Sequence, residues 1–130
     1  SRYALMSQRS GCGGSNWQLY AVANPECGGN KIFWDGDCSS QNTPTGTWTN
    51  IVAVADGTNR KLYVNGVLSN VLNLGSNIGS FSVPTIIGDE SCGNYFNGKI
   101  DEVVIWNRAL SDQEVQNIYN CYQNPQCTTP

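Results

Sequence analysis

The sequence contains no histidine, and this absence removes the commonest arrangements for nucleophilic catalysis. Ser-His and Cys-His pairs both need an imidazole beside the nucleophile. A structural zinc site is also disfavoured, because the six cysteines include no pair with C-x-x-C spacing. In a chain of 130 residues, six cysteines favour disulfides formed in an oxidising compartment, although their number permits many different pairings.

Charged residues are also scarce, at 13% of the chain, and the net charge is −3. A weakly acidic surface disfavours nucleic acids and anionic membranes as partners. No apolar run approaches the ~18 residues that a membrane-spanning helix needs. The abundant residues are glycine, with 14 copies, and the turn-forming Asn, Ser and Thr. This composition is typical of a turn-rich β protein, and the length predicts a single domain over residues 1–130.

The most informative stretch lies near the C-terminus. Residues 100–106 end in four consecutive apolar side chains, which predicts a strand covered on both faces. Ser111 and Glu114 have the spacing of a capping box, and Leu110 can pack on Val115 as a hydrophobic staple. A short amphipathic helix is therefore predicted, with apolar residues recurring at i, i+3, i+4 and i+7. Its apolar face consists of Val115, Ile118, Tyr119 and Tyr122.

Several earlier segments combine β-branched or aromatic residues with flanking turn signals, which is the pattern of short strands. The segment Lys61–Asn73 contains Asn65-Gly66, the strongest short-range signal for a β-hairpin. About seven or eight short strands at this spacing predict an all-β, two-sheet antiparallel sandwich with one short C-terminal helix. The predicted strands are Ser1–Arg9, Trp17–Ala23, Lys31–Asp35, Trp48–Asp56, the hairpin Lys61–Asn73 and Pro84–Asp89.

Alternation in the first two strands predicts which side chains share a face. In the first strand, Tyr3, Leu5 and Ser7 are expected on one side. In the second strand, Trp17, Leu19 and Ala21 are expected on one side, opposite Gln18, Tyr20 and Val22.

Two segments, LYVNGV at 62–67 and GKIDEVVIWNRALS at 98–111, resemble laminin-G-like, or concanavalin A-like, lectin domains. The similarity is good from about Trp48 to Tyr122 and looser before that. The resemblance implies a two-sheet jelly roll, usually extracellular, that often binds carbohydrate and sometimes uses calcium. No EF-hand-like spacing is present, so calcium is expected from the resemblance alone.

The resemblance also implies further strands ahead of the segment that matches residues 1–22. A jelly roll without them would leave an open hydrophobic edge, which promotes aggregation. We therefore expect a second chain to supply these strands, most simply the N-terminal part of the same precursor after proteolytic cleavage. The protein would then be a heterodimer of two chains from one precursor.

If successive strands are antiparallel, the loops alternate between two rims of the sandwich. One predicted rim collects loops 10–16, 36–47, 65–66 and 89–97, and the other collects loops 25–30, 57–60 and 75–83 together with the helix and the C-terminal tail. This prediction places three cysteines on each rim: Cys12, Cys38 and Cys92 on the first, and Cys27, Cys121 and Cys127 on the second. Two explanations of these odd numbers stay open. Either a cysteine of each rim bonds to another chain, or a crossover breaks the alternation.

The first rim also gathers carboxylates, amides and an aromatic residue, which can contact sugar hydroxyls and sugar faces. The same residue types suit turns for purely structural reasons, so both interpretations stay open. The residues expected to bind carbohydrate are Asp35, Asp37, Asn42, Asp89, Asn94 and Tyr95. The candidate calcium ligands are Asp35, Asp37 and Glu90. Among the tryptophans, Trp34 beside the long loop is the best candidate for a sugar platform.

Catalysis is not expected. A retaining glycosidase needs two carboxylates about 5–5.5 Å apart, and no E-x-D-x-x-E strand pattern is present. The adjacent Asp101 and Glu102 would point to opposite faces of a strand. The leading interpretation is a secreted carbohydrate-binding protein, a lectin or lectin subunit, whose affinity for glycans comes from several subunits acting together. The alternative is a laminin-G-type adhesion module that binds protein and has no sugar site.

Overall fold

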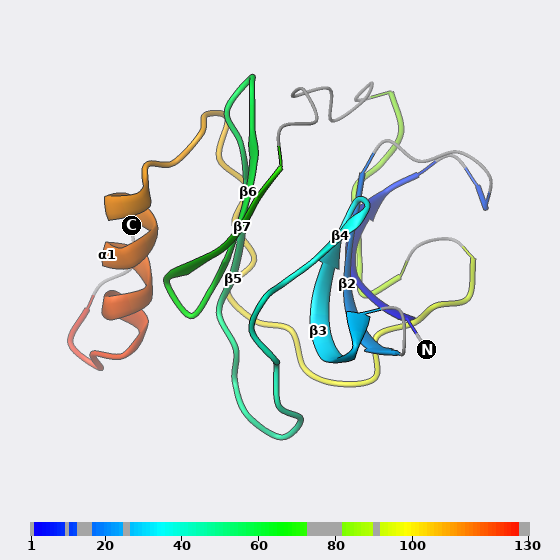
Figure 1. The fold of residues 1–130 in the computed structure, drawn as a ribbon, viewed down its shortest axis with the longest axis horizontal. Coiled ribbons are helices and arrows are strands. Elements are labelled where there is room, and N and C mark those ends of the chain that lie inside the picture. Colours follow the sequence, from blue (N-terminus) through cyan, green and yellow to red (C-terminus); the bar gives the residue numbers. More distant parts are fainter. Residues whose placement is uncertain are drawn as a thin grey trace.

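The computed structural model describes residues 2–9, 11–12, 17–24, 27–72, 82–89 and 92–127. These residues form three layers: the helix α1 (Asp112–Tyr122), a three-stranded sheet in the middle, and a five-stranded sheet on the far side (Figure 1). The predicted all-β sandwich with one C-terminal helix is confirmed. No helix in the described ranges is long and apolar enough to cross a membrane.

The five-stranded sheet has the order β4-β3-β2-β1-β8, and every neighbouring pair is antiparallel. Its inner face, toward the other sheet, carries Leu19 and Ala21 beside the buried Ile32 and Trp34. The outer face carries Ala4, Tyr20, Val22 and Cys27. The predicted alternation of the second strand is thus confirmed. The strands are β1 (Arg2–Gln8), β2 (Trp17–Asn24), β3 (Gly29–Trp34), β4 (Asp37–Cys38) and β8 (Ile86–Ile87).

A β-bulge changes the predicted alternation of the first strand. The register shifts between Ala4 and Met6, so that Met6 lies opposite Leu19 and Ser7 opposite Gln18. One extra residue reverses the side-chain direction beyond it. The expectation that Ser7 shares the face of Tyr3 and Leu5 is therefore wrong.

The three-stranded sheet is built from β5 (Ile51–Ala55), β6 (Arg60–Val64) and β7 (Val67–Leu72), in that order. Leu62 and Val64 face the five-stranded sheet, whereas Val54 and Tyr63 face the helix. The predicted hairpin between β6 and β7 is confirmed within residues 60–72. Both of its turn residues have positive φ, 51° at Asn65 and 74° at Gly66, which is the geometry of a type I′ turn.

The helix begins as predicted. The Ser111 side chain accepts a hydrogen bond from the Glu114 backbone N–H, and the Glu114 carboxylate accepts one from the Ser111 N–H at 2.8 Å. Leu110 and Val115 are both buried in one cluster with Val54 and Tyr63. The capping box and the packing of the helix on the sheet are confirmed.

The strand predicted over residues 100–106 is not formed. This segment has no regular secondary structure, and Val103, Val104 and Ile105 are exposed by 40%, 44% and 67%. The reason is physical: a strand needs a neighbour to accept its backbone hydrogen bonds, and no described strand lies in register beside this segment. The apolar sequence is typical of a buried strand, but its partner is not in these residues.

Two other predicted strands are shorter than expected. The strand predicted from Trp48 starts only at Ile51, and Trp48 itself is 65% exposed. The strand predicted over Pro84–Asp89 is reduced to β8, whose two residues pair with the end of β1.

All six cysteines are paired within the chain, as Cys12–Cys92, Cys27–Cys38 and Cys121–Cys127. Residue 27 folds over the outer face of the five-stranded sheet, where it meets Cys38 on β4. The explanation that cysteines bond to another chain is therefore wrong, and the placement of Cys27 and Cys38 on opposite rims is wrong with it. A crossover breaks the alternation: the loop 39–50 runs from one end of the sandwich to the other before β5 begins (Figure 1).

An ion pair ties the two sheets together at one end. The Arg60 guanidinium, at the start of β6, donates to the Asp35 carboxylate, in the turn after β3, at 2.6 Å. The two side chains are only 8% and 14% exposed, and the guanidinium also lies 5.9 Å from the centre of the Trp34 ring. Asp35 and Arg60 belong to different sheets and lie on either side of the crossover in the sequence. Their ion pair fixes the relative position of the two sheets at this end.

Replacing Gly66 should destabilise the fold more than replacing a glycine in open space. A Cβ added at Gly66 would lie 2.9 Å from the Tyr119 Cβ on α1. Left-handed strain and overpacking together predict that Gly66→Ala lowers the free energy of unfolding by roughly 2–4 kcal/mol. Gly46→Ala is the control, because Gly46 has a φ of 78° and no atom within 4 Å of the added Cβ. Equal losses for both variants in urea titrations would contradict the packing of the turn on the helix.

The contribution of Glu114 to stability should depend on pH. Bonds from Arg108 and from the Ser111 N–H lower the pKa of this carboxyl from 4.5 to about 2. Because the folded-state pKa is depressed, the contribution is present above about pH 4.5 and is lost as the pH falls toward 2. In urea titrations, Glu114→Gln should therefore have a lower midpoint than wild type at pH 7. The difference between the two midpoints should become smaller as the pH falls toward 2. Gln113→Ala is the control, because Gln113 is an exposed neighbour that does not titrate. The difference between its urea midpoint and that of wild type should not depend on pH.

Removing the carboxylate of Asp35 should leave a buried cation without its partner. We expect Asp35→Ala to lower the free energy of unfolding by roughly 3 kcal/mol. The double variant Asp35→Ala, Arg60→Met should be more stable than Asp35→Ala alone, because the uncompensated charge has gone. Simple addition of the two single losses in a double-mutant cycle would show that the pair is not coupled.

Candidate functional site

The predicted sugar-binding residues fall into two groups. Asp37 and Asn42 lie along one edge of the five-stranded sheet, on β4 and the loop that follows it. Asp89 follows β8 at the opposite edge, and Asn94 and Tyr95 come after it in the chain. Four strand spacings separate these edges, which amounts to roughly 19 Å. The structure therefore does not bring the six residues into one site.

Asp35 belongs to neither group, because its carboxylate is occupied by Arg60. Burial raises the pKa of Asp35, and the charge and hydrogen bond of Arg60 only partly offset this effect. A carboxylate committed to a guanidinium is a poor calcium ligand. Glu90, the other candidate ligand besides Asp37, lies outside the described residues. Within the described ranges, no three Asp, Glu, Cys or His side chains lie close enough together to hold a metal ion.

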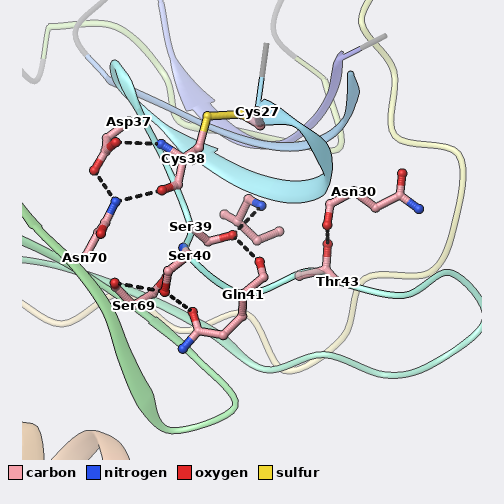
Figure 2. Close-up of a disulfide and its surroundings, with 11 residues drawn as sticks. Cys27, Asn30, Asp37, Cys38, Ser39, Ser40, Gln41, Thr43, Ser69 and Asn70 are labelled. Atoms are coloured by element: carbon pink, nitrogen blue, oxygen red, sulfur yellow. Dashed lines mark hydrogen bonds between the residues drawn. A yellow bond between two sulfur atoms is a disulfide. The ribbon is translucent and has the colours of Figure 1, made fainter. Parts of the chain in front are cut away.

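The group around β4 forms a polar surface that we call the polar ridge. It takes residues from β3, β4, the following loop and β7, so that it crosses from one sheet to the other (Figure 2). Its members are Asn30, Asp37, Ser40, Gln41, Asn42, Thr43, Ser69 and Asn70.

The base of the polar ridge is the buried Ser39, which is 1% exposed. Its backbone N–H donates to the Ile32 carbonyl at 2.7 Å, and its hydroxyl accepts from the Ile32 N–H at 3.0 Å. The hydroxyl also donates to the Gln41 carbonyl at 2.7 Å. Farther along, the Thr43 N–H donates to the Asn30 carbonyl at 2.7 Å. Residues 39–43 are thus strapped along β3, where they cover the edge of the sheet that the two-residue β4 leaves open.

Asp37 and Asn70 connect the two sheets across the polar ridge. The Asn70 side-chain N–H₂ donates to the Asp37 carboxylate and to the Cys38 carbonyl, the latter at 2.7 Å. The other Asp37 oxygen accepts from the Cys38 N–H at 2.9 Å. Both side chains are half-buried, so the pair presents a fixed amide and carboxylate at the surface.

A second connection joins Ser40 to Ser69. The Ser40 N–H donates to the Ser69 hydroxyl at 2.8 Å, and the Ser40 hydroxyl lies 3.1 Å from the Ser69 carbonyl and 3.0 Å from the Gln41 side-chain oxygen. These contacts are exposed to solvent. They therefore place two hydroxyls and an amide side by side on the surface, beside Asp37 and Asn70 (Figure 2).

Behind the polar ridge, the Cys27–Cys38 disulfide fixes β4 to the loop after β2. Asn42 is exposed, and its side-chain oxygen lies over Gly29, 3.0 Å from the position a Cβ would take. Only a glycine at that position leaves this room. The backbone beneath the polar ridge is thus held from three sides by a disulfide, the Ser39 hydrogen bonds and the contacts with β7.

The aromatic residues are placed differently from the sequence-based expectation. Trp34 is 5% exposed and packs in the core, so it cannot act as a sugar platform. Among the described residues, the exposed large rings are Tyr95, at 66%, and Trp48, at 65%. Trp48 was not predicted to be exposed, because the residues that follow it have the pattern of a core strand that begins there.

Six members of the polar ridge were not predicted: Asn30, Ser40, Gln41, Thr43, Ser69 and Asn70. Ser69 and Asn70 belong to a strand predicted correctly, but their contact with residues 37–40 spans about 30 positions of the sequence. No local signal marks such a pair. The only indication of this contact was that Ser69 and Asn70 are two successive polar residues in a hairpin strand. Alternation predicts that one of them would be apolar.

Two comparisons relate this geometry to known proteins. The family model described as the concanavalin A-like lectin/glucanases superfamily matches residues 3–116. The fold is similar to the crystal structure of an S-layer domain-containing protein from Clostridium thermocellum, with a TM-score of 0.52 and 24% identity. That match covers 84% of this chain but 59% of the other, so this chain spans less than two thirds of its structural relative. Comparison with curated protein sequences gives no match.

The match to the family model covers most of the chain and agrees with the two antiparallel sheets, the hairpin and the capped helix described above. The sequence resemblance to laminin-G-like domains is confirmed by the same match. The chain therefore belongs to the concanavalin A-like lectin/glucanase superfamily.

Proposed function

We propose that this chain is a carbohydrate-binding domain of an extracellular protein, and that the polar ridge contacts the sugar. The observation that supports this most directly is the set of hydroxyl, amide and carboxylate groups that Asp37, Ser40, Ser69 and Asn70 hold side by side. Neighbouring hydroxyls of a pyranose can donate to a carboxylate or an amide oxygen and accept from an amide N–H₂. Membership of a superfamily whose description includes lectins is consistent with this proposal.

Preorganisation supports the choice of the polar ridge over the second group of residues. Its side chains already bond one another, so a sugar would meet groups whose conformational entropy has been lost on folding. Part of the same network also covers the edge of the sheet, which is a structural role. Ser39 and the Thr43 backbone already hold residues 39–43 along β3. The side chains of Ser40, Gln41 and Asn42 are therefore not needed to cover the edge of the sheet.

The proposed activity is binding without hydrolysis. The chain has no histidine, and the carboxylates nearest the polar ridge are both engaged, Asp35 with Arg60 and Asp37 with Asn70. A retaining glycosidase would need two carboxylates about 5–5.5 Å apart, one of them able to donate a proton. Asp35 and Asp37 are therefore not available as the nucleophile and the proton donor of such an enzyme.

Three disulfides support an extracellular location. The proposed site is shallow and open, so a single sugar would bind weakly. Useful affinity would then come from several copies presented together, which is the reason to propose an oligomer or a multidomain parent. A calcium ion bound at the proposed site would take the Asp37 carboxylate as a ligand.

Binding should depend on the polar ridge and not on exposed amides elsewhere. On a glycan array, Asn70→Ala and Ser40→Ala should each weaken binding about fivefold, because each removes a hydrogen bond worth on the order of 1 kcal/mol. Asn117→Ala should bind like wild type, because Asn117 is an exposed amide on α1, behind the three-stranded sheet. Free sugar should abolish the signal, and adding a chelator tests the calcium requirement.

An array without signal would favour the adhesion module that binds protein. Binding that survives both substitutions on the polar ridge would instead move the site to the exposed Tyr95 and the half-buried Asn94, at the opposite edge of the sheet. In that case Tyr95→Ala should abolish the signal.

A further inference from the structure

The hydrogen-bond donors and acceptors of the polar ridge are not equally available to a ligand. An amide side chain has two N–H donors and one oxygen acceptor. In Asn70 both donors are used, one on the Asp37 carboxylate and one on the Cys38 carbonyl. Both partners are acceptors, so they fix the orientation of the amide. No described residue donates to the Asn70 side-chain oxygen, which therefore remains available as an acceptor.

Asp37 adds further acceptor capacity beside Asn70. A carboxylate has roughly four lone-pair positions on its two oxygens and no donor. The Cys38 N–H uses a position on one oxygen, and the Asn70 amide uses a position on the other. Asp37 is only half-buried, so a ligand at the surface can use the positions that remain.

The hydroxyl proton of Ser40 is also used within the polar ridge. Three acceptors lie around it: the Gln41 side-chain oxygen at 3.0 Å, the Ser69 carbonyl at 3.1 Å and the Ser69 hydroxyl at 3.2 Å. A hydroxyl has one proton and two lone pairs, so Ser40 offers a ligand an acceptor and no donor. Where Asp37, Ser40 and Asn70 lie side by side, unused acceptors therefore outnumber unused donors (Figure 2).

The charge of the polar ridge agrees with this excess of acceptors. Asp37 is its only member with a formal charge, and the other seven side chains are neutral. One cation, Arg60, lines the same small cavity as Asp37, but it is buried and bonded to Asp35. These three side chains together keep a net charge of −1.

These properties restrict the class of sugar that fits the polar ridge. A sugar with a carboxylate or sulfate group would bring a second anion beside Asp37, which is repulsive. A neutral sugar could use only hydroxyl protons on the unused acceptors. A protonated amino group has three N–H donors and a positive charge. Its hydrogen bonds to a carboxylate are charge-assisted and roughly twice as strong as neutral ones.

We propose that the polar ridge selects glycans that carry a protonated amino group, such as oligosaccharides of glucosamine, and that the Asp37 carboxylate binds this ammonium. Hydroxyls of the same sugar donate to the Asn70 side-chain oxygen and to Ser40. The inference rests on the proposed function, since it names the class of glycan that the same site takes. Asp37 is then the residue that determines specificity.

Two matched ligands test the proposal. Oligosaccharides of glucosamine and of N-acetylglucosamine, with the same length and linkage, differ in whether the nitrogen is an ammonium or a neutral amide. With a chelator present, so that no metal ion occupies Asp37, the chain should bind the glucosamine oligosaccharide at least about tenfold more tightly. An oligosaccharide of glucuronic acid should bind less tightly than either. Equal binding, or a preference for the acetylated or the anionic ligand, would overturn the proposal.

Matched substitutions assign the preference to one carboxylate. Asp37→Asn should bring the ratio of the two affinities close to unity, because it removes the charge and keeps an oxygen for the Cys38 N–H. Asp101→Asn is the control, because Asp101 is exposed and outside the polar ridge, and an Asn oxygen can still accept from the Glu102 N–H. The ratio for this control should equal that of wild type. An unchanged ratio in Asp37→Asn would contradict the role of this residue.

Salt decides the question if Asp37→Asn binds neither oligosaccharide. Dissolved ions screen an exposed ion pair, so the wild-type preference for the amino sugar should fall as the ionic strength rises. A preference that is independent of salt would overturn the proposal. Glycan binding without this preference would refute the present inference alone, whereas a wild-type chain that binds no glycan at all would refute the proposed function as well.

Discussion

Every strand edge in this fold presents backbone N–H and C=O groups that need partners, and the way each edge is treated explains the rest of the structure. The outer edge of the five-stranded sheet is covered twice, by β4 and then by the strap of residues 39–43. The edge formed by β1 is bonded by β8 and by Asn94. The inner edge of β5 has no such cover within the described residues. Among the described residues, the β4 edge is therefore covered and the β5 edge is not.

Local signals in the sequence predicted local structure well. The capping box at Ser111 and the type I′ turn at Asn65-Gly66 formed as predicted, because each depends on residues within four positions of one another. Residues 100–106 were predicted as a strand from an equally strong local pattern, yet they have none of the pairing that a strand requires. The pattern describes what the side chains would do if covered, but it contains no information on whether a neighbour is present.

The candidate site also shows that local patterns do not reveal which distant residues become neighbours. Asp37 and Asn42 were predicted as sugar ligands from their place in a long polar loop, and they do lie on the polar ridge. Asp89, Asn94 and Tyr95 were grouped with them because simple alternation of strands placed all these loops on one rim. The crossover at 39–50 changes that alternation, and the strand order of the five-stranded sheet places the two groups at opposite edges. Asn70 was missed because its partners are fixed by the contact between the sheets.

The contacts that join β4 to β7 give the two sheets a common seam. Residues of the polar ridge come from both sides of this seam, so the distance between Ser40 and Ser69 depends on how far apart the sheets stand. A change in the separation of the sheets would therefore alter the polar ridge, and by reciprocity a ligand that prefers one arrangement of the ridge would favour the matching separation.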